Sequence, residues 1–341
     1  MRILLIGPAF DIAGASLNLL RIADILLRAG HTLSVAAQER KYGALRQAYL
    51  DRGVTIVEGI RARDFDLAIC NTILTGNIVT VLGSKIPVIW WIRECHIGGH
   101  LVREHPELAG GFPTAWRIVF QSRFVRDAIF GAQLKDVAQD RVRIVPQGIA
   151  VPESYPAPQK QQRQLVLVVG TLTSRKRPRD VFRAVRSLQR DDVELVSVGK
   201  TQKVDPVVPR MAADDPAHYR LLGELSREAC FGWIAGADVL AHAASDESQP
   251  NVLIEAAYAG TAIAASDLPV LHECGWVDGE NCLLHPVGDE PRLAANIARL
   301  LDDRELAQRL AARARETVCP RFAMDVFEQR LLDLVAEASA A

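Results

Sequence analysis

Short apolar runs alternate with amphipathic segments along the 341-residue chain. In the first half, one segment, 16–30, places its apolar residues at helical spacing and ends at Gly30, which predicts a helix. Apolar runs on either side of it predict strands at 2–7, 32–37, 66–71, 87–92, 117–122 and 142–147. This alternation is typical of a parallel sheet covered by helices on both faces.

Near residue 150 the pattern is interrupted. Residues 151–164 are rich in Pro and Gln and almost free of large apolar side chains, which indicates a linker. The alternation then restarts, with strands expected at 165–170, 193–199, 219–225, 239–244 and 262–266, and helices at 177–189, 227–237, 250–259, 290–303, 304–318 and 321–338. We therefore expect one domain over 1–155, a second over 156–320, and a last helix within 321–341 that crosses back to the first domain.

Composition excludes some functions. With 40 basic and 41 acidic residues and only 6% aromatic residues, the chain is not typical of a dedicated nucleic-acid binder. Residues 1–150 carry 18 basic against 13 acidic residues, a net +5, and the remainder carries 22 against 28, a net −6. The basic first half favours an anionic acceptor or a membrane surface, although ordinary surface variation explains so small an offset equally well.

The six cysteines have no CxxC pair and no zinc spacing, so we interpret them as reduced, packed thiols. The apolar run at the start of the sequence ends at Gly7-Pro8, too early for a signal peptide or a membrane span. A cytoplasmic location follows as an expectation. Peripheral contact with the inner face of the membrane stays open, since no amphipathic anchor is obvious.

In open parallel sheets, ligands bind beyond the carboxyl ends of the strands, and four such places carry chemistry. The first is the turn and helix start at 7–20. Gly14 and Ala15 allow a close approach of the backbone there, and free N–H groups at the helix start favour a phosphate. The turn lacks the full GxGxxG spacing, so a dinucleotide site is not supported, and an ordinary loop explains it equally well.

The second place is the segment 170–181, where Arg175, Lys176 and Arg177 cluster at the start of a helix. The helix dipole disfavours cations at that end, so an anion is needed nearby. A bound phosphate would satisfy both the side chains and the free N–H groups, and a solvated basic loop is the alternative.

The third place follows the strand 87–92, where Arg93, Glu94 and His96 come in quick succession. Any of these groups could contact a hydroxyl of a sugar or an acceptor. A lone histidine is nevertheless more often structural than catalytic.

The fourth place is the helix at 250–259, which begins at Pro250 and stops at Gly260. The N–H groups of Asn251 and Val252 at its start could bind an anion. Glu255 lies on an apolar face, so its carboxylate needs donors such as ribose hydroxyls, a basic side chain or solvent.

Glu247 and Glu255 are separated by seven residues, in ESQPNVLIE. Together with GTLTSRKRPRDVFRAV, RLLGELSREACFGWIAGADVLAHAASDES, VRIVPQGIAV and GENCLLHPVGD, this pattern resembles the retaining glycosyltransferases of family 4. The resemblance implies an α/β fold of the GT-B type, with two facing Rossmann-like doubly wound domains and a cleft between them.

The resemblance also implies roles for individual residues. Glu255 would hold the ribose, Glu247 the hydroxyls of the donor sugar, and Lys176 the diphosphate. Other residues expected at the donor site are Gly14, Ala15, Gly170, Thr171, Leu225, Ser248, Pro250, Asn251 and Val252.

This chain departs from the family pattern at two positions. Thr171 stands where relatives often have an arginine, for which Arg175 is a candidate substitute. Arg93 stands where relatives often have a histidine, for which His96 is a candidate replacement. Arg175, Arg93 and His96 therefore join Glu247 and Lys176 as candidate catalytic residues.

The implied reaction transfers a sugar from a UDP- or GDP-sugar to a hydroxyl of a glycan, lipid-linked or small-molecule acceptor, with the anomeric configuration retained. Basic side chains would replace a metal ion, so no metal and no cofactor beyond the sugar nucleotide are expected. The resemblance places such an enzyme in bacterial polysaccharide synthesis. Two alternatives stay open: another sugar-nucleotide enzyme of the same fold, such as an epimerase, and a non-catalytic protein that binds nucleotide sugars.

Overall fold

A computed structural model describes residues 1–341 except 13, 39–42, 159–161, 202–204 and 340–341. It divides into two compact units, the first comprising 1–147 and 325–341 and the second 148–324. The boundaries thus fall at 147 and 324, whereas the sequence suggested 155 and 320. Residues 325–341 belong to unit 1 although they follow all of unit 2 in the chain.

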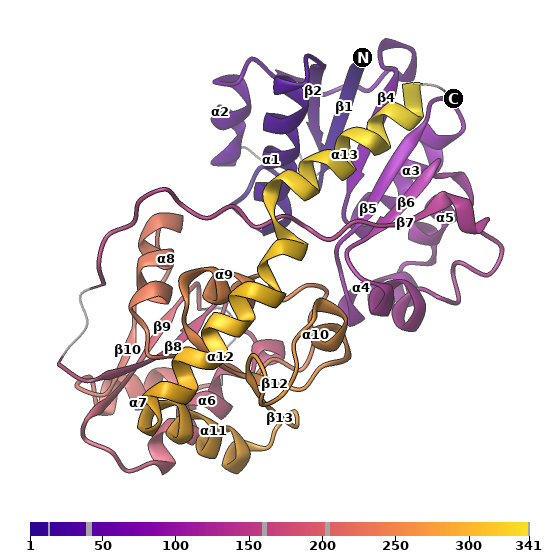
Figure 1. The fold of residues 1–341 in the computed structure, drawn as a ribbon. Coiled ribbons are helices and arrows are strands. Elements are labelled where there is room, and N and C mark those ends of the chain that lie inside the picture. The colour runs from indigo at the N-terminus through magenta and orange to yellow at the C-terminus, as the bar shows by residue number, and fades with distance from the viewer. Residues whose placement is uncertain (13, 39–42, 159–161, 202–204, 340–341) are drawn as a thin grey trace. The chain divides into compact units, whose positions relative to one another are not determined.

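The described residues of unit 1 form a seven-stranded parallel sheet in the order β3-β2-β1-β4-β5-β6-β7 (Figure 1). From β1 to β3 the chain adds strands towards one edge of the sheet, and from β4 to β7 it adds them towards the other edge. The strand order therefore reverses between the neighbouring strands β1 and β4. The strands are β1 (Arg2–Gly7), β2 (Thr32–Ala37), β3 (Thr55–Ile56), β4 (Leu67–Asn71), β5 (Val88–Ile92), β6 (Arg117–Phe120) and β7 (Val142–Ile144).

Helices cover this sheet because each presents one apolar stripe to it. Val79, Val102 and Phe112, from three of these helices, join the core of β4, β5 and β6. On α13, Phe327 packs its ring 5.7 Å from that of Trp91. The helices are α1 (Gly14–Arg28), α2 (Leu45–Leu50), α3 (Gly76–Gly83), α4 (His96–Glu104), α5 (Gly111–Thr114) and α13 (Met324–Ser339).

Unit 2 repeats the arrangement. Its described residues form a six-stranded parallel sheet in the order β10-β9-β8-β11-β12-β13, with the reversal between β8 and β11. The strands are β8 (Gln164–Val169), β9 (Val193–Val198), β10 (Tyr219–Leu221), β11 (Val239–His242), β12 (Ala262–Ser266) and β13 (Leu283–His285).

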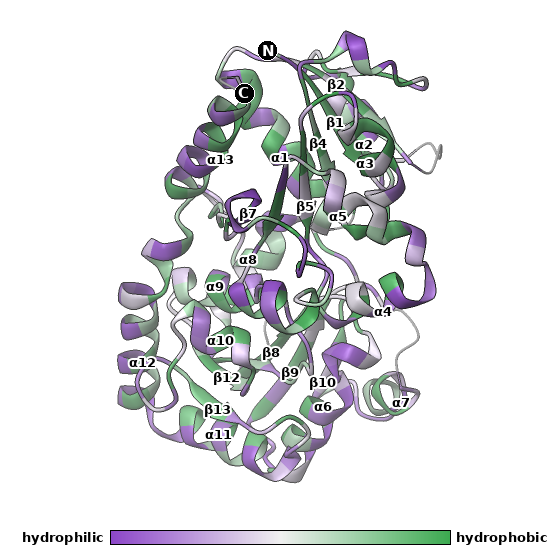
Figure 2. Ribbon diagram, turned by 90° about the vertical axis from the view of Figure 1, so that its right-hand side faces the viewer, coloured by the Kyte–Doolittle hydropathy of each residue, from purple (hydrophilic) through white to green (hydrophobic). Residues whose placement is uncertain are grey.

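The helices of unit 2 are likewise amphipathic, and Figure 2 shows hydrophobic and hydrophilic residues alternating along α12. Phe182, Met211 and Ile297, from three helices, close one face of the sheet. The helices are α6 (Pro178–Ser187), α7 (Val207–Asp214), α8 (Arg227–Gly236), α9 (Asn251–Ala259), α10 (Pro269–Cys274), α11 (Glu290–Asp302) and α12 (Arg304–Thr317).

Both units are therefore parallel α/β structures, and the predicted fold class is confirmed at this level. The central strands of each sheet are buried on both faces, which explains why they appear in the sequence as continuous apolar runs, whereas β3, β7 and β10 are only partly buried. Over the part of the chain that the structure describes, no helix combines the length and the apolar character needed to cross a membrane.

Candidate functional site

The reversal between β8 and β11 brings together two loops that are distant in the sequence. Such a position in an open sheet is where ligands bind, beyond the carboxyl ends of the strands. Gly170 directly follows β8 and has φ +129°, and Gly199 directly follows β9 and has φ +142°. A Cβ at Gly199 would lie 2.1 Å from the carbonyl oxygen of Gly170, so only glycine allows these two strand ends to approach so closely.

The loop after β8 carries the predicted basic cluster. Ser174–Lys176 forms a 3₁₀ turn, and α6 follows directly. The carbonyl of Arg175 accepts a hydrogen bond from the N–H of Ser245 at 2.9 Å, and its guanidinium donates to the carbonyl of Asp246. These bonds fasten the loop after β8 to the loop after β11.

Glu247 lies at the centre of the two loops and is only 7% exposed. Its Oε1 accepts a hydrogen bond from Lys176 Nζ, and Arg175 Nη1 lies 3.5 Å from Oε2. Burial by itself would raise the pKa of Glu247, but the charge of Lys176, the bond from His242 and the charge of Arg175 hold it below its ordinary value. Glu247 is therefore an ionised acceptor at neutral pH.

His242, at the end of β11, is a member of this cluster that sequence reasoning missed. Its Nε2 lies 3.0 Å from Glu247 Oε1, and the residue is 5% exposed. Burial lowers the pKa of His242 below its ordinary value, although Glu247 acts in the opposite direction. A neutral ring donates from Nε2, which leaves Nδ1 buried and without a partner in the described part of the chain. A polar residue ending an apolar strand was the signal available.

Arg177 forms the corner between this loop and α6. It has φ +47°, an unusual conformation for a residue with a side chain. Its Nε donates to Oδ2 of the buried Asp180 at 2.6 Å. The sequence predicts an anion close to the basic cluster. Two carboxylates of the chain itself, those of Glu247 and Asp180, occupy such positions.

The helix α9 runs from Asn251 to Ala259 and is followed by the capping residue Gly260, which has φ +77°, so the helix predicted at 250–259 is confirmed. From the sequence, the N–H of Asn251 is expected to bind an anion. In the structure this N–H instead donates to the carbonyl of Gln249 at 2.9 Å. Glu255 is partly exposed and lies close enough to Cys230 on α8 to help burial raise the pKa of that thiol to about 12.

Other residues expected at the donor site surround these loops. Thr171 is exposed, and Ser248 and Leu225 are partly buried, the last in the loop between β10 and α8. Thr171 follows Gly170 directly, at the carboxyl end of β8. The expected contacts of these three residues with the donor remain predictions.

The remaining candidates lie in unit 1. Gly14 begins α1, and the carbonyl of Ala15 accepts a hydrogen bond from Asn71 at 2.9 Å. Arg93 is buried beyond β5, whereas His96 is exposed at the start of α4, with its ring 6.1 Å from that of Phe124.

The two units match two family descriptions. Residues 153–317 match "Glycosyl transferases group 1", and residues 1–108 match "Glycosyl-transferase family 4". The chain belongs to the group 1 glycosyltransferases of family 4. The predicted family is thereby confirmed.

Curated relatives of this glycosyltransferase resemble it over part of their length. It is 35% identical over 128 residues to a phosphatidyl-myo-inositol mannosyltransferase of Mycolicibacterium smegmatis, a match that covers 37% of this chain and 32% of the relative. It is 31% identical over 126 residues to the lipopolysaccharide core biosynthesis glycosyltransferase LpsE of Rhizobium meliloti, covering 34% of this chain and 36% of the relative. The matched region spans about a third of each relative.

Solved structures resemble the glycosyltransferase over almost its whole length. Anabaena Alr3699/HepE in complex with UDP and glucose has a TM-score of 0.82 at 17% identity, covering 99% of this chain and 100% of that one. The lipopolysaccharide outer core galactosyltransferase WaaB, in its apo form, has a TM-score of 0.72 at 14% identity, covering 99% of each chain. At these identities the likeness shows the fold, which is GT-B as predicted.

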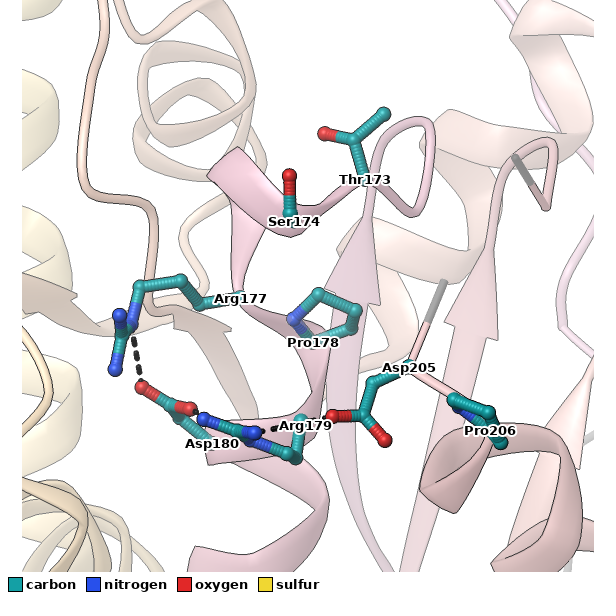
Figure 3. A pocket seen from close by; sticks show the side chains of 8 residues that line it. All are labelled: Thr173, Ser174, Arg177, Pro178, Arg179, Asp180, Asp205 and Pro206. Atoms are coloured by element: carbon teal, nitrogen blue, oxygen red, sulfur yellow. Dashed lines mark hydrogen bonds and ion pairs between the residues drawn. The ribbon is translucent and has the colours of Figure 1, made fainter. Parts of the chain in front are cut away.

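The glycosyltransferase also has a pocket of about 470 Å³ beside the loop after β8 (Figure 3). Arg177 and Asp180 line it, as does Asp205, which accepts from Arg179 at 3.0 Å. The charged side chains in this pocket are thus already paired with one another. Lys176 and Glu247 are not among its lining residues, so the pocket adjoins the cluster of Glu247 without containing it.

Proposed function

We propose that the chain transfers a sugar from a nucleotide diphosphate sugar, with UDP or GDP as the nucleotide, to a hydroxyl of a glycan, lipid-linked or small-molecule acceptor. The configuration at the anomeric carbon is retained, and the reaction requires no metal ion. The observation that carries the proposal is the buried pairing of Glu247 with Lys176 beyond the carboxyl ends of β8 and β11.

The proposed chemistry follows from the charges at this place. As the bond between the sugar and the diphosphate breaks, negative charge develops on the diphosphate, and nearby fixed cations stabilise it. Lys176 and Arg175 are the cations available in these loops. In this proposal the diphosphate replaces Glu247 as the partner of Lys176 when the donor binds.

Glu247 then acts as an acceptor and not as an acid. An ionised carboxylate only accepts hydrogen bonds, which suits a group that holds the hydroxyls of a donor sugar. The depressed pKa of Glu247 argues against a role in donating a proton at neutral pH. Glu255, on the second turn of α9, is proposed to hold the ribose.

The relatives support the class of substrate. The relative in Mycolicibacterium smegmatis is named as a mannosyltransferase, and LpsE as a glycosyltransferase of lipopolysaccharide core biosynthesis. HepE was solved with UDP and glucose. A sugar nucleotide as donor and a glycan as acceptor are therefore the first substrates to test.

The experiment measures release of nucleotide from UDP-glucose and GDP-mannose in the presence and absence of glycan acceptors. Lys176→Ala and Glu247→Ala should each lower acceptor-dependent release by about 100-fold or more, since each removes a group that contacts the reacting donor. Arg210→Ala is the matched control, because Arg210 is an exposed cation of the same unit.

The outcomes separate the alternatives. Wild-type release by both variants would contradict the proposal. Interconversion of donor sugars without an acceptor would indicate an epimerase. Binding of nucleotide sugars without any turnover, by protein that is folded and pure, would indicate a non-catalytic binding protein.

A further inference from the structure

Unit 1 contains a buried cation whose side-chain partners are all neutral. Arg93 is only 9% exposed and follows β5 directly. Its Nε donates to Asn71 Oδ1, its Nη2 to Asn18 Oδ1, and its Nη1 to Gln147 Oε1 at 3.3 Å. The ring of Trp91, whose centre lies 5.0 Å from the guanidinium carbon, attracts the cation but carries no net charge. Amide oxygens satisfy hydrogen bonds and are also neutral, so none of these partners supplies a negative charge to Arg93.

Two other charged groups act on Arg93. The carboxylate of Glu94 accepts from the backbone N–H groups of Ile73 at 2.9 Å and Arg93 at 3.0 Å, and no ion pair joins it to the guanidinium among the described residues. The charge of Arg21 opposes that of Glu94. Burial lowers the pKa of Arg93 to about 9, so the group stays charged at neutral pH. The carboxylate of Glu94 therefore acts on the guanidinium of Arg93 without pairing with it.

The same place has hydrogen-bond donors in excess. A guanidinium has five N–H groups, and the bonds to the three amides use three of them, which leaves one on each terminal nitrogen of Arg93. Beside it, Nδ2 of Asn18 is buried and has no partner in the part of the chain that the structure describes. A carboxylate or phosphate accepts from two such terminal N–H groups at once.

Arg93 and Asn18 lie at a position relative to the sheet where ligands commonly bind. Asn71 ends β4, and its Nδ2 bonds to the carbonyl of Ala15 at the start of α1. β1 and β4 are the strands between which the sheet of unit 1 reverses. Arg93 and Asn18 thus lie beyond the carboxyl ends of the strands, beside the reversal, where open sheets bind ligands.

We propose that Arg93 and Asn18 bind an anionic group of the sugar substrates, a carboxylate or a phosphate. This inference rests on the proposed function only in assigning the anion to a substrate of glycosyl transfer. The anion has two sources: the carboxylate of a uronic acid in the donor, or a phosphate or carboxylate on the acceptor.

The first experiment measures binding, so that it does not depend on turnover. Calorimetric titrations compare methyl α-D-glucopyranoside with its 6-carboxylate and its 6-phosphate. The wild-type chain should bind at least one of the anionic sugars about tenfold or more tightly than the neutral one, and Arg93→Gln should abolish the difference. Arg63→Gln is the control, because Arg63 is an exposed cation of the same unit. Equal binding of all three sugars by the wild type, or a preference that persists in Arg93→Gln, overturns the proposal.

A second variant keeps the test decisive if Arg93→Gln does not fold. Asn18→Asp places a carboxylate against Nη2 of Arg93 and so supplies the missing anion from within the chain. It should raise the melting temperature and remove the preference for anionic sugars. A folded Asn18→Asp protein that keeps the preference overturns the proposal.

The source of the anion is decided by two further arms. A preference for UDP-glucuronate over UDP-glucose that depends on Arg93 places the anion on the donor. A preference for phosphorylated over neutral acceptor that depends on Arg93 places it on the acceptor. If no sugar is transferred under any condition, the proposed function fails, and the titrations still decide whether Arg93 binds an anion.

Discussion

Replacing Lys176 with methionine tests how far the buried carboxylate of Glu247 depends on its cation. Methionine is of similar length but carries no charge. The side chain of Lys176 is 19% exposed and that of Glu247 is 8% exposed, so water can replace the lost partner only poorly. The variant should therefore be less stable than the wild type.

The expected loss follows from the contacts that remain. Removing one partner of a buried ion pair costs about 3–5 kcal/mol, because the other charge is left uncompensated. Arg175 Nη1 at 3.5 Å and His242 Nε2 at 3.0 Å still act on the carboxylate. We therefore expect the lower end of the range, about 3 kcal/mol at pH 7.

The sign of the pH dependence is fixed by the direction of the pKa shift. The pKa of Glu247 lies below its ordinary value of 4.5 in the folded chain, so its contribution to stability is present above pH 4.5 and is lost as the pH falls through the folded pKa. Without Lys176 the pKa of Glu247 rises. The difference in stability between the two proteins should then narrow as the pH falls below 4.5.

Urea unfolding at pH 7 and pH 4, followed by circular dichroism, measures this difference. The double variant Lys176→Met/Glu247→Gln should return to within about 1 kcal/mol of the wild type at pH 7, because the uncompensated charge is gone. The reasoning is refuted if Lys176→Met costs less than about 1 kcal/mol, or if the second substitution restores nothing.

Three other substitutions test separate features. His242→Phe removes a donor to the buried carboxylate and should lower acceptor-dependent nucleotide release by about tenfold, whereas His242→Gln keeps a donor and should restore it; equal rates in both variants would count against this role. Gly199→Ala places a Cβ 2.1 Å from the carbonyl of Gly170 and should lower stability by about 3 kcal/mol or more in thermal unfolding. Gly223→Ala is its control, because φ is +69° there but the space is open, and it should cost about 1 kcal/mol. Burial lowers the pKa of His285 from 6.5 to about 4, so the unfolded chain binds a proton first and stability should fall between pH 6.5 and pH 4 by about 2 kcal/mol. His285→Gln should flatten that decline in melting temperature, and an unchanged slope would contradict it.

The elements with a regular pattern could be predicted from the sequence. The strands at 2–7 and 32–37 and the helix at 250–259 were found within one residue of the predicted bounds. Buried parallel strands leave uninterrupted apolar runs, and Pro and Gly mark the ends of α9. The short strands β3 and β13 were missed, because so few residues carry too little pattern.

The contacts of the candidate site could be predicted only in part. The sequence singled out Lys176 and Glu247 but not their pairing, which joins residues 71 positions apart through the order of the strands. The sequence did not reveal His242, because one polar residue at the end of an apolar strand forms no periodic pattern. The three amide partners of Arg93 come from three separate segments, and no local pattern connects them.

The place of α13 in the chain has a consequence for how the protein is made. Arg28 pairs with Glu328 at 2.7 Å and Arg117 with Glu337 at 3.0 Å, so unit 1 incorporates the helix that follows unit 2. During synthesis the ribosome adds all of unit 2 before this helix emerges. Unit 2 can therefore fold before unit 1 receives Phe327, whose ring packs against that of Trp91, and we expect the core of unit 1 to be completed last.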